Sequence, residues 1–310
     1  DYEYEGLKNN LIKNNIYLGK VSRIEPSLQA AFVDFGRDRH GFLSFNDIQS
    51  DYYQIPKSDL EIIKQEEQRA REELSKKVEA KEEENLAEGK LELEDPIEKE
   101  ELNEKKEEEK ENLDNGKIKK NENKFRFKRY KIQEVIKPNQ VILVQVIKDE
   151  RGQKGAALST FISIAGKYIV LMPNTSKGGS ISRKIFNSLD RQKIRSILNE
   201  IEIPKSMGVI VRTAGANKTK NEIEKDFKNT LKTWEEIGDK ALNSNAPSLV
   251  YEEGDIIKRT LRDTYDNETK NVYIHGNDAY QKAKKFMKEL MPKNVKNIKK
   301  YRGKIPLFHE

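Results

Sequence analysis

The sequence predicts an α+β protein of more than one domain, in which a small closed β-barrel comes first. Short apolar runs broken by glycine and proline fill residues 15–45, which is typical of such a barrel. Apolar residues recur every three or four positions over residues 221–242, which is typical of an amphipathic helix. Strand-like and helix-like segments alternate after residue 247, and 310 residues are enough for two or three small domains.

The barrel strands are expected at residues 16–23, 30–35, 41–45, 141–148 and 156–159. Between the third and fourth of them, residues 58–124 contain no aromatic residue and are rich in Glu and Lys. Because so few apolar residues cannot form a packed core, we expect an insertion in a barrel loop, helical over residues 58–88 and otherwise disordered. The insertion is interpreted as a solvated spacer, or alternatively as a tether whose basic end, residues 117–131, touches a partner or RNA.

Beyond the barrel, strands are expected at residues 168–172 and 208–213, with a turn at Gly178-Gly179 and a short helix at residues 190–200. In the amphipathic helix at residues 221–242, Trp234 is interpreted as a core residue rather than a ligand platform. Strands at residues 248–252 and 271–275 and helices at residues 255–264 and 278–290 are expected to form an α/β unit.

The charge of the chain favours a polyanionic partner. Residues 61–130 carry 23 acidic and 18 basic side chains, which leaves 30 acidic and 41 basic side chains elsewhere and makes the remainder strongly basic. The absence of cysteine excludes disulfides, thiolate zinc sites and a cysteine nucleophile, and we expect a cytoplasmic location. No apolar run is long enough to span a membrane and none follows a basic run near residue 1, so we expect neither a membrane span nor a leader.

Aromatic and basic residues occur together in the expected barrel. Phe32 and Phe42 lie near strand positions that can point outward, close to Lys20, Arg23 and Lys154. Small barrels bind single strands by stacking bases on such rings and pairing phosphates with such cations. The alternative is that one of the two phenylalanines belongs to the core.

A second candidate site follows the apolar run of residues 209–211. Arg212 at the end of a buried strand would have a held stem and a free planar fork, which suits a phosphate, with the Thr213 hydroxyl beside it. Arg183 is a plausible second fork, and either arginine can instead belong to a surface ion pair.

Other motifs carry less. The run GANKT at residues 215–219 lacks the glycine that a phosphate loop needs before Lys218. The three histidines, His40, His275 and His309, lack metal-ligand spacing. A structural role is expected for three carboxylates, those of Asp34, Asp263 and Asp266.

Several longer runs resemble the N-terminal part of the catalytic region of the ribonuclease E/G family of bacterial endoribonucleases. They are NIYLGK at residues 15–20, RIEPSLQAAFVDFG at 23–36, HGFL at 40–43, ERGQKGAAL at 150–158, residues 161–173, ISR at 181–183 and VRTAG at 211–215. The pattern of residues 23–42 is more similar to the E branch than to the G branch. The resemblance covers nearly all of the chain outside the insertion.

The resemblance implies an S1-type OB-fold barrel for RNA binding at residues 10–160, with the charged insertion at residues 57–130. It implies a 5′-sensor subdomain at residues 161–245 and an RNase H-like subdomain at residues 246–303, with a remnant of the latter at residues 1–9. Residues 304–310 would begin a nuclease domain, so the catalytic aspartates that bind Mg²⁺ and the cysteines that bind zinc are expected beyond Glu310. The chain by itself is then expected to bind RNA without cutting it.

Carried over by position, Phe32, Phe42 and Lys154 match residues that grip single-stranded RNA. The positions that match a pocket for a 5′-monophosphate are Gly166, Val170, Arg183, Arg212 and Thr213. The implied function is single-strand-specific, Mg²⁺-dependent endoribonucleolytic processing and decay of RNA, with a homo-oligomer as the full-length form. The alternatives are a stand-alone, non-catalytic S1-type RNA-binding protein and a scaffold centred on the insertion.

Overall fold

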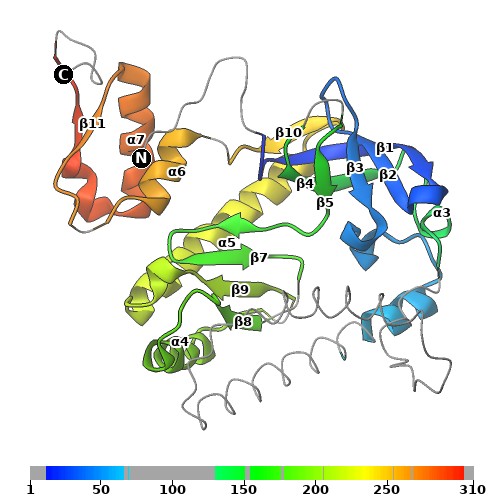
Figure 1. Ribbon diagram of the computed structural model, residues 1–310, viewed down its shortest axis with the longest axis horizontal. Helices are drawn as coiled ribbons and strands as arrows, with labels where there is room; N and C mark the ends of the chain where they lie inside the picture. Colours follow the sequence, from blue (N-terminus) through cyan, green and yellow to red (C-terminus); the bar gives the residue numbers. More distant parts are fainter. Residues whose placement is uncertain are drawn as a thin grey trace, which may run out of the picture. The chain divides into compact units, whose positions relative to one another are not determined.

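The computed structural model describes residues 12–65, 69, 130–150, 154–175, 178–204, 206–253, 255–266 and 268–303 (Figure 1). The chain divides into two compact units, one made of Asp1–Leu60 with Lys131–Glu310 and the other of Glu61–Tyr130. Residues 57–65 and residue 69 are helical, in agreement with the start of the helix expected at residues 58–88. The rest of that helix, most of the insertion at 57–130, and the expected segments 1–9 and 304–310 lie outside the described residues.

Five strands close into the predicted barrel. They are β1 (Ile16–Glu25), β2 (Ala30–Asp34), β3 (Gly41–Ser44), β4 (Val141–Lys148) and β5 (Ala157–Ser159). They follow one another in the order β1-β2-β3-β5-β4, and β4 pairs back onto β1. The β3–β5 pair is parallel and the others are antiparallel, as expected of the OB fold.

Alternation along the strands directs apolar side chains into the barrel. These buried side chains include Val21, Val33, Leu43, Ile142, Val144, Val146 and Leu158. The turns around the barrel include 3₁₀ turns and one short helix, at Pro26–Leu28, Phe45–Asp47, Ser50–Tyr52 and Ile132–Val135.

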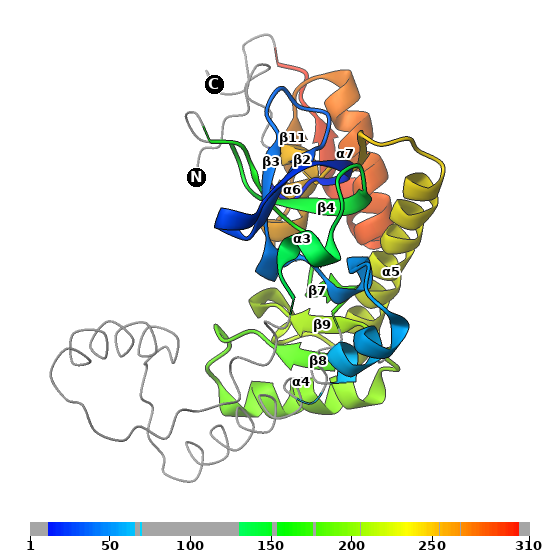
Figure 2. The same ribbon diagram turned by 90° about the vertical axis from the view of Figure 1, so that its right-hand side faces the viewer.

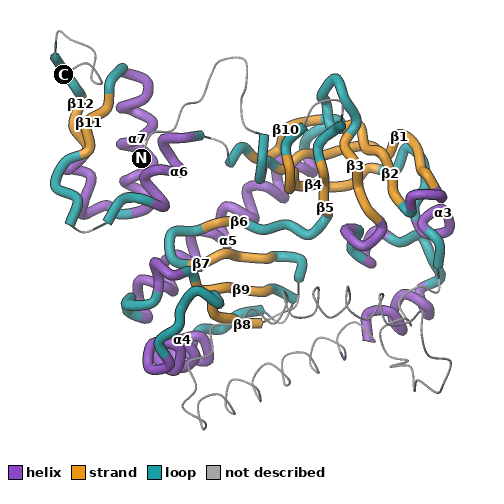
Figure 3. Tube along the Cα trace, in the orientation of Figure 1, coloured by secondary structure: helices purple, strands orange, loops and turns teal. Residues whose placement is uncertain are grey.

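A second sheet has the order β6-β7-β9-β8 (Figure 3). Its strands are β6 (Ile164–Ala165), β7 (Ile169–Met172), β8 (Gly178–Ile181) and β9 (Gly208–Val211). The expected turn at Gly178-Gly179 is wrong, because these residues begin β8, which pairs in parallel with β9. A side chain at Gly179 would meet Leu198 at 3.1 Å, so glycine here allows a helix to pack closely on the strand.

Two helices cover one face of this sheet (Figure 2). Asn187 caps α4 (Ser188–Glu200), and Thr219 forms a capping box at the start of α5 (Lys220–Leu242). Their apolar stripes pack on the alternate strand residues that point toward them. Trp234 of α5 packs against this core and against a second one shared with β1 and β10, which confirms its interpretation as a core residue.

The last part of the chain contains β10 (Ser248–Tyr251), α6 (Ile256–Asp263), β11 (Val272–Ile274), α7 (Asn277–Leu290), a 3₁₀ segment (Pro292–Asn297) and β12 (Ile298–Lys300). Strands β11 and β12 are parallel, and with α6 and α7 they enclose a small core around Leu261 and Met287. The expected grouping of residues 248–252 with this α/β unit is corrected, because β10 pairs antiparallel with β1 at the barrel.

Candidate nucleic-acid interface

Two phenylalanines form a ring pair on the outside of the barrel. Phe32 of β2 lies directly opposite Phe42 of β3, and their rings meet edge to face with centroids 6.0 Å apart. Their neighbours along the strands are buried, so alternation places both rings on the outer face. Phe42 is 36% exposed and Phe32 is half-buried, so neither belongs to the barrel interior.

Cationic groups lie beside this ring pair. The guanidinium of Arg23 lies 4.4 Å from the centre of the Phe32 ring. Both residues line a hollow of about 440 Å³ together with Ser22, Asp38, Arg39, His40 and Gly155. Exposed Lys154 immediately precedes Gly155, whose backbone packs so closely on the His40 carbonyl that a side chain there would collide with it. The result is an exposed surface of rings and cations, the combination that binds single strands.

The second sheet brings the other predicted residues to one edge. Ile181 of β8 pairs with Val211 of β9, and the Ser182 amide donates to the Val211 carbonyl at 2.9 Å. Arg183 and Arg212 therefore leave the sheet at the same edge. Because β7 is antiparallel to β9, the turn containing Gly166 lies there too, and the Arg212 amide donates to the Tyr168 carbonyl at 2.8 Å.

Val170 and Thr213 complete the predicted set. Val170 pairs with Ile210, which lies two positions before Arg212. Because alternate strand residues share a face, the side chains of Val170 and Arg212 both point to the sheet face opposite α4 and α5. Thr213 is exposed at the first position of a 3₁₀ turn, Thr213–Gly215. Arg183 is also exposed, and Arg191 donates to the Ser182 and Ile185 carbonyls and so holds the turn that carries it.

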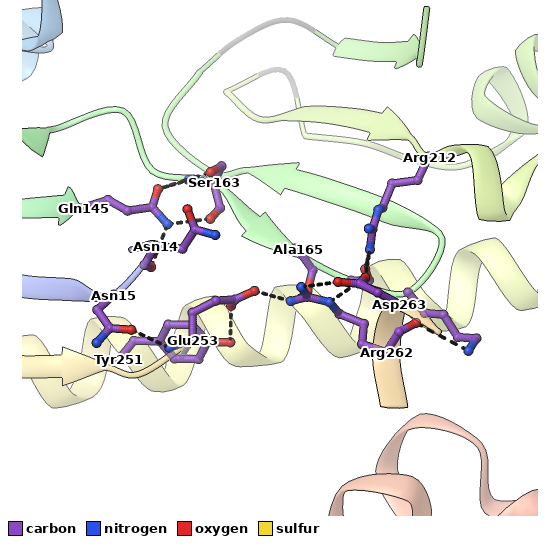
Figure 4. A network of polar contacts seen from close by, with 12 residues as sticks. Asn14, Asn15, Gln145, Ser163, Ala165, Arg212, Tyr251, Glu253, Arg262 and Asp263 are labelled. Atoms are coloured by element: carbon purple, nitrogen blue, oxygen red, sulfur yellow. Dashed lines mark hydrogen bonds and ion pairs between the residues drawn. The ribbon is translucent and has the colours of Figure 1, made fainter. Parts of the chain in front are cut away.

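Arg212 is less free than the sequence suggested. Its Nη1 donates to the Gly166 carbonyl at 2.8 Å and to Asp263 Oδ1 at 2.6 Å (Figure 4). The ion-pair alternative for Arg212 and the structural role expected for Asp263 are thus both observed. The edge therefore presents one exposed arginine and one that is held by a carboxylate.

A buried carboxylate that the sequence analysis missed shapes this edge. Asp226 of α5 accepts hydrogen bonds from the backbone amides of Lys167, Tyr168 and Ile169, at 3.2, 2.8 and 3.1 Å. Burial raises its pKa, although the three amides and the charge of Arg212 oppose the rise. A side chain at Gly166 would meet Asp226 Oδ2 at 2.6 Å, so the turn requires glycine. An aspartate within the buried stripe of α5 was the available signal.

Two lysines were also missed. Lys167 is buried, its Nζ donates to the Tyr265 carbonyl at 2.6 Å, and burial together with the charge of Lys218 lowers its pKa. Lys218, which follows the 3₁₀ turn, lies 5.4 Å from the centre of the Tyr168 ring. It therefore adds a positive charge near the edge, even though the motif around it is not a phosphate loop.

The other two carboxylates for which a structural role was expected, those of Asp34 and Asp266, accept hydrogen bonds within turns. Asp34 accepts from the Gly36 amide at 3.0 Å, and Asp266 accepts from the Thr269 amide at 2.8 Å. Over the described ranges, no group of three or more His, Cys, Asp or Glu side chains could hold a metal ion. None of the described helices is long and apolar enough to cross a membrane.

The rings and cations on the barrel indicate a protein that binds single-stranded nucleic acid, and comparisons with known proteins agree with this class. A model of the Ribonuclease E/G family matches residues 163–310. Over 99% of the chain, the sequence is 32% identical to ribonuclease E of Haemophilus influenzae and 33% identical to ribonuclease E of Escherichia coli. Ribonuclease G of Escherichia coli is 26% identical over 96% of the chain and is matched over 47% of its own length.

The chain is similar to the ribonuclease E/G family, and its identity to these two ribonuclease E relatives exceeds its identity to ribonuclease G. It spans 26% of the Haemophilus protein and 23% of the Escherichia coli ribonuclease E.

Proposed function

We propose that this chain is the part of a ribonuclease E-like endoribonuclease that grips single-stranded RNA and recognises a 5′-monophosphate. The observation that carries the proposal is the parallel pairing of β8 with β9, which brings Arg183 and Arg212 to one sheet edge. The ring pair on the barrel and the ribonuclease names of the relatives support it further.

The barrel would hold the strand. Bases stack on Phe32 and Phe42, and the backbone phosphates pair with Arg23 and Lys154, which lie at the same surface. Stacking tolerates every base because each has a flat face, so the barrel contributes affinity with little sequence preference. We propose that this barrel is of the S1 type and occupies residues 10–160.

The sheet edge would hold the end of the strand. A terminal phosphate carries nearly two negative charges near neutral pH, as phosphorylated side chains do. Arg183 and Arg212 offer planar forks to its oxygens and Thr213 offers a hydroxyl, while Gly166 and Val170 form the wall. A 5′-hydroxyl has no such charge, so the edge discriminates by electrostatics.

These roles define the proposed subdomains. Residues 161–245 form the 5′ sensor, and residues 246–303 with residues 1–9 form an RNase H-like part, of which β10 pairs with β1 of the barrel rather than with β11 or β12. The whole enzyme would hydrolyse single-stranded RNA in processing and decay with Mg²⁺. The oligomer, the zinc and the cytoplasmic location remain predictions.

The alternative of a stand-alone, non-catalytic RNA-binding protein is not favoured. The matched relatives are ribonucleases, and the match to ribonuclease E extends over 99% of this chain rather than over the barrel alone. Both functions would use the ring pair, and they differ in whether aspartates that bind Mg²⁺ follow residue 310 in the full-length protein.

The proposal is tested with two single-stranded RNAs of one sequence, one bearing a 5′-monophosphate and the other a 5′-hydroxyl. We expect the monophosphate to bind about tenfold more tightly at fixed low salt, because charge-assisted hydrogen bonds form only with it. Arg212→Ala should remove this preference, measured by fluorescence anisotropy. Arg302→Ala removes an exposed arginine elsewhere and should retain it. Equal binding of both RNAs by the unaltered chain would contradict the proposal.

A further inference from the structure

The Arg212 guanidinium is fixed through one of its three nitrogens. Nη1 donates to both Asp263 and the Gly166 carbonyl, and all hydrogen bonds of this side chain within the described residues use that atom. The side chain is 29% exposed. The edge formed by Nε and Nη2 therefore remains available for two parallel bonds to an anion.

Asp263 is itself held in a defined orientation. Arg262 donates from Nε to Oδ1 at 3.0 Å and from Nη2 to Oδ2 at 2.9 Å, so both carboxylate oxygens are fixed by one planar fork. Partial burial raises the pKa of Asp263, but the hydrogen bonds and charges of Arg262 and Arg212 outweigh it and lower the pKa below its ordinary value. The group that orients Arg212 is thus a permanently charged carboxylate near neutral pH.

Arg262 is held in turn by residues next to strands β1 and β10 of the barrel sheet (Figure 4). Its Nη1 pairs with the buried carboxylate of Glu253 and donates to the Ala165 carbonyl at 3.3 Å. The Tyr251 hydroxyl donates to Glu253 at 3.0 Å, and Asn15 accepts from the Glu253 amide at 2.9 Å. Because Asn15 immediately precedes β1 and Tyr251 ends β10, the network extends from the barrel sheet to the sensor edge.

We propose that the Arg262–Asp263 pair is a positioning element that presets Arg212 for the terminal phosphate, an inference that rests on the proposed function. A long arginine side chain loses rotamer freedom when it binds an anion, and a side chain that is already fixed loses less. Asp263 is also paired with two guanidinium groups, those of Arg212 and Arg262, which together offset its negative charge. The carboxylate then repels the incoming phosphate less than an unpaired one would.

The opposite role would be competition, in which Asp263 stays paired with Arg212 until a phosphate displaces the carboxylate. The two roles predict changes of opposite sign when the charge of Asp263 is removed. Loss of a positioning group lowers the preference for a monophosphate, whereas loss of a competitor raises it. The observed geometry favours positioning, because Asp263 contacts Nη1, and within the described residues Nε and Nη2 make no hydrogen bond that an anion would have to displace.

The test measures the monophosphate preference of four variants with the two RNAs described above. Asp263→Asn and Arg262→Lys should each lower the preference about fivefold, as loss of a charged hydrogen bond would, and leave binding of the 5′-hydroxyl RNA within about twofold. Asp263→Glu should retain part of the preference. Glu200→Gln breaks an exposed ion pair with Lys220 in the same subdomain and should change nothing. Thermal unfolding checks that each variant is folded.

The outcomes separate this inference from the proposed function. An unchanged or increased preference in folded Asp263→Asn and Arg262→Lys, with Arg212→Ala still abolishing it, would overturn the positioning role and leave the 5′ sensor intact. Equal binding of both RNAs by the unaltered chain would overturn the sensor and the positioning role together. A selective loss of preference in both variants would support the positioning role.

Discussion

Replacement of both Phe32 and Phe42 by alanine is expected to weaken binding of single-stranded RNA by about a hundredfold or more, because stacking on each ring contributes about 1–3 kcal/mol per base. The two rings face the same side of the barrel and contact each other, so together they form one continuous platform. The preference for a 5′-monophosphate over a 5′-hydroxyl should survive the double substitution, since it originates at another edge of the molecule.

Binding is measured by anisotropy with the 5′-hydroxyl RNA, which isolates the barrel from the terminal phosphate. Phe32→Tyr with Phe42→Tyr keeps both ring faces and should bind nearly as well as the unaltered chain. Tyr273→Ala removes a ring that is 52% exposed on β11 and serves as the matched control. Retention of full RNA affinity by the folded alanine double variant would remove the barrel from the interface.

Asp226→Ala is expected to lower the free energy of unfolding by about 3 kcal/mol or more, because it leaves three buried backbone amides without their acceptor. The change should also remove the monophosphate preference, because those amides shape the turn that presents Gly166 to Arg212. Asp226→Asn should be intermediate, since its amide group can replace only one of the two carboxylate oxygens as an acceptor.

Stability is measured by urea denaturation with the fluorescence of Trp234, the single tryptophan of the chain, which lies on α5 and packs against two core clusters. Asp239→Ala alters an exposed aspartate of the same helix and should change the unfolding free energy by less than about 0.5 kcal/mol. An Asp226→Ala variant as stable as the Asp239→Ala variant would show that the carboxylate does not support this turn.

The barrel could be predicted because its information is local. Apolar alternation and the turn residues that interrupt it specify where each strand begins and ends, and the strands lie within a residue or two of their expected bounds. Strand β8 was missed because Gly178-Gly179 offers no alternating side chains, and the close packing of Gly179 on Leu198 depends on α4, which follows β8 in the sequence. The pairing of β10 with β1 was missed because a short strand carries no signal for its partner.

The residues of the candidate site also differ in whether local sequence could predict them. Phe32 and Phe42 follow from strand alternation, and the parallel pairing of β8 with β9 brings Arg183 near Arg212 as a consequence of the fold. Arg212 and Asp263 are separated by 51 residues, and no spacing rule connects a strand end with the end of a distant helix. The hydrogen bonds of Asp226 to residues 167–169 were equally hidden, because a buried carboxylate is recognised only when its donors are known.

The central claim, that the 5′ end of RNA lies at the sheet edge while the barrel holds bases, is tested most directly by crosslinking. A single-stranded RNA carries 4-thiouridine as its first nucleotide and either a 5′-monophosphate or a 5′-hydroxyl, and crosslinked peptides are identified by mass spectrometry. With the monophosphate, we expect crosslinks to residues 166–172, 181–186 and 212–219, and with the hydroxyl we expect these crosslinks to be weak. Crosslinks confined to residues 20–44 and 154–158 with both RNAs would contradict the account.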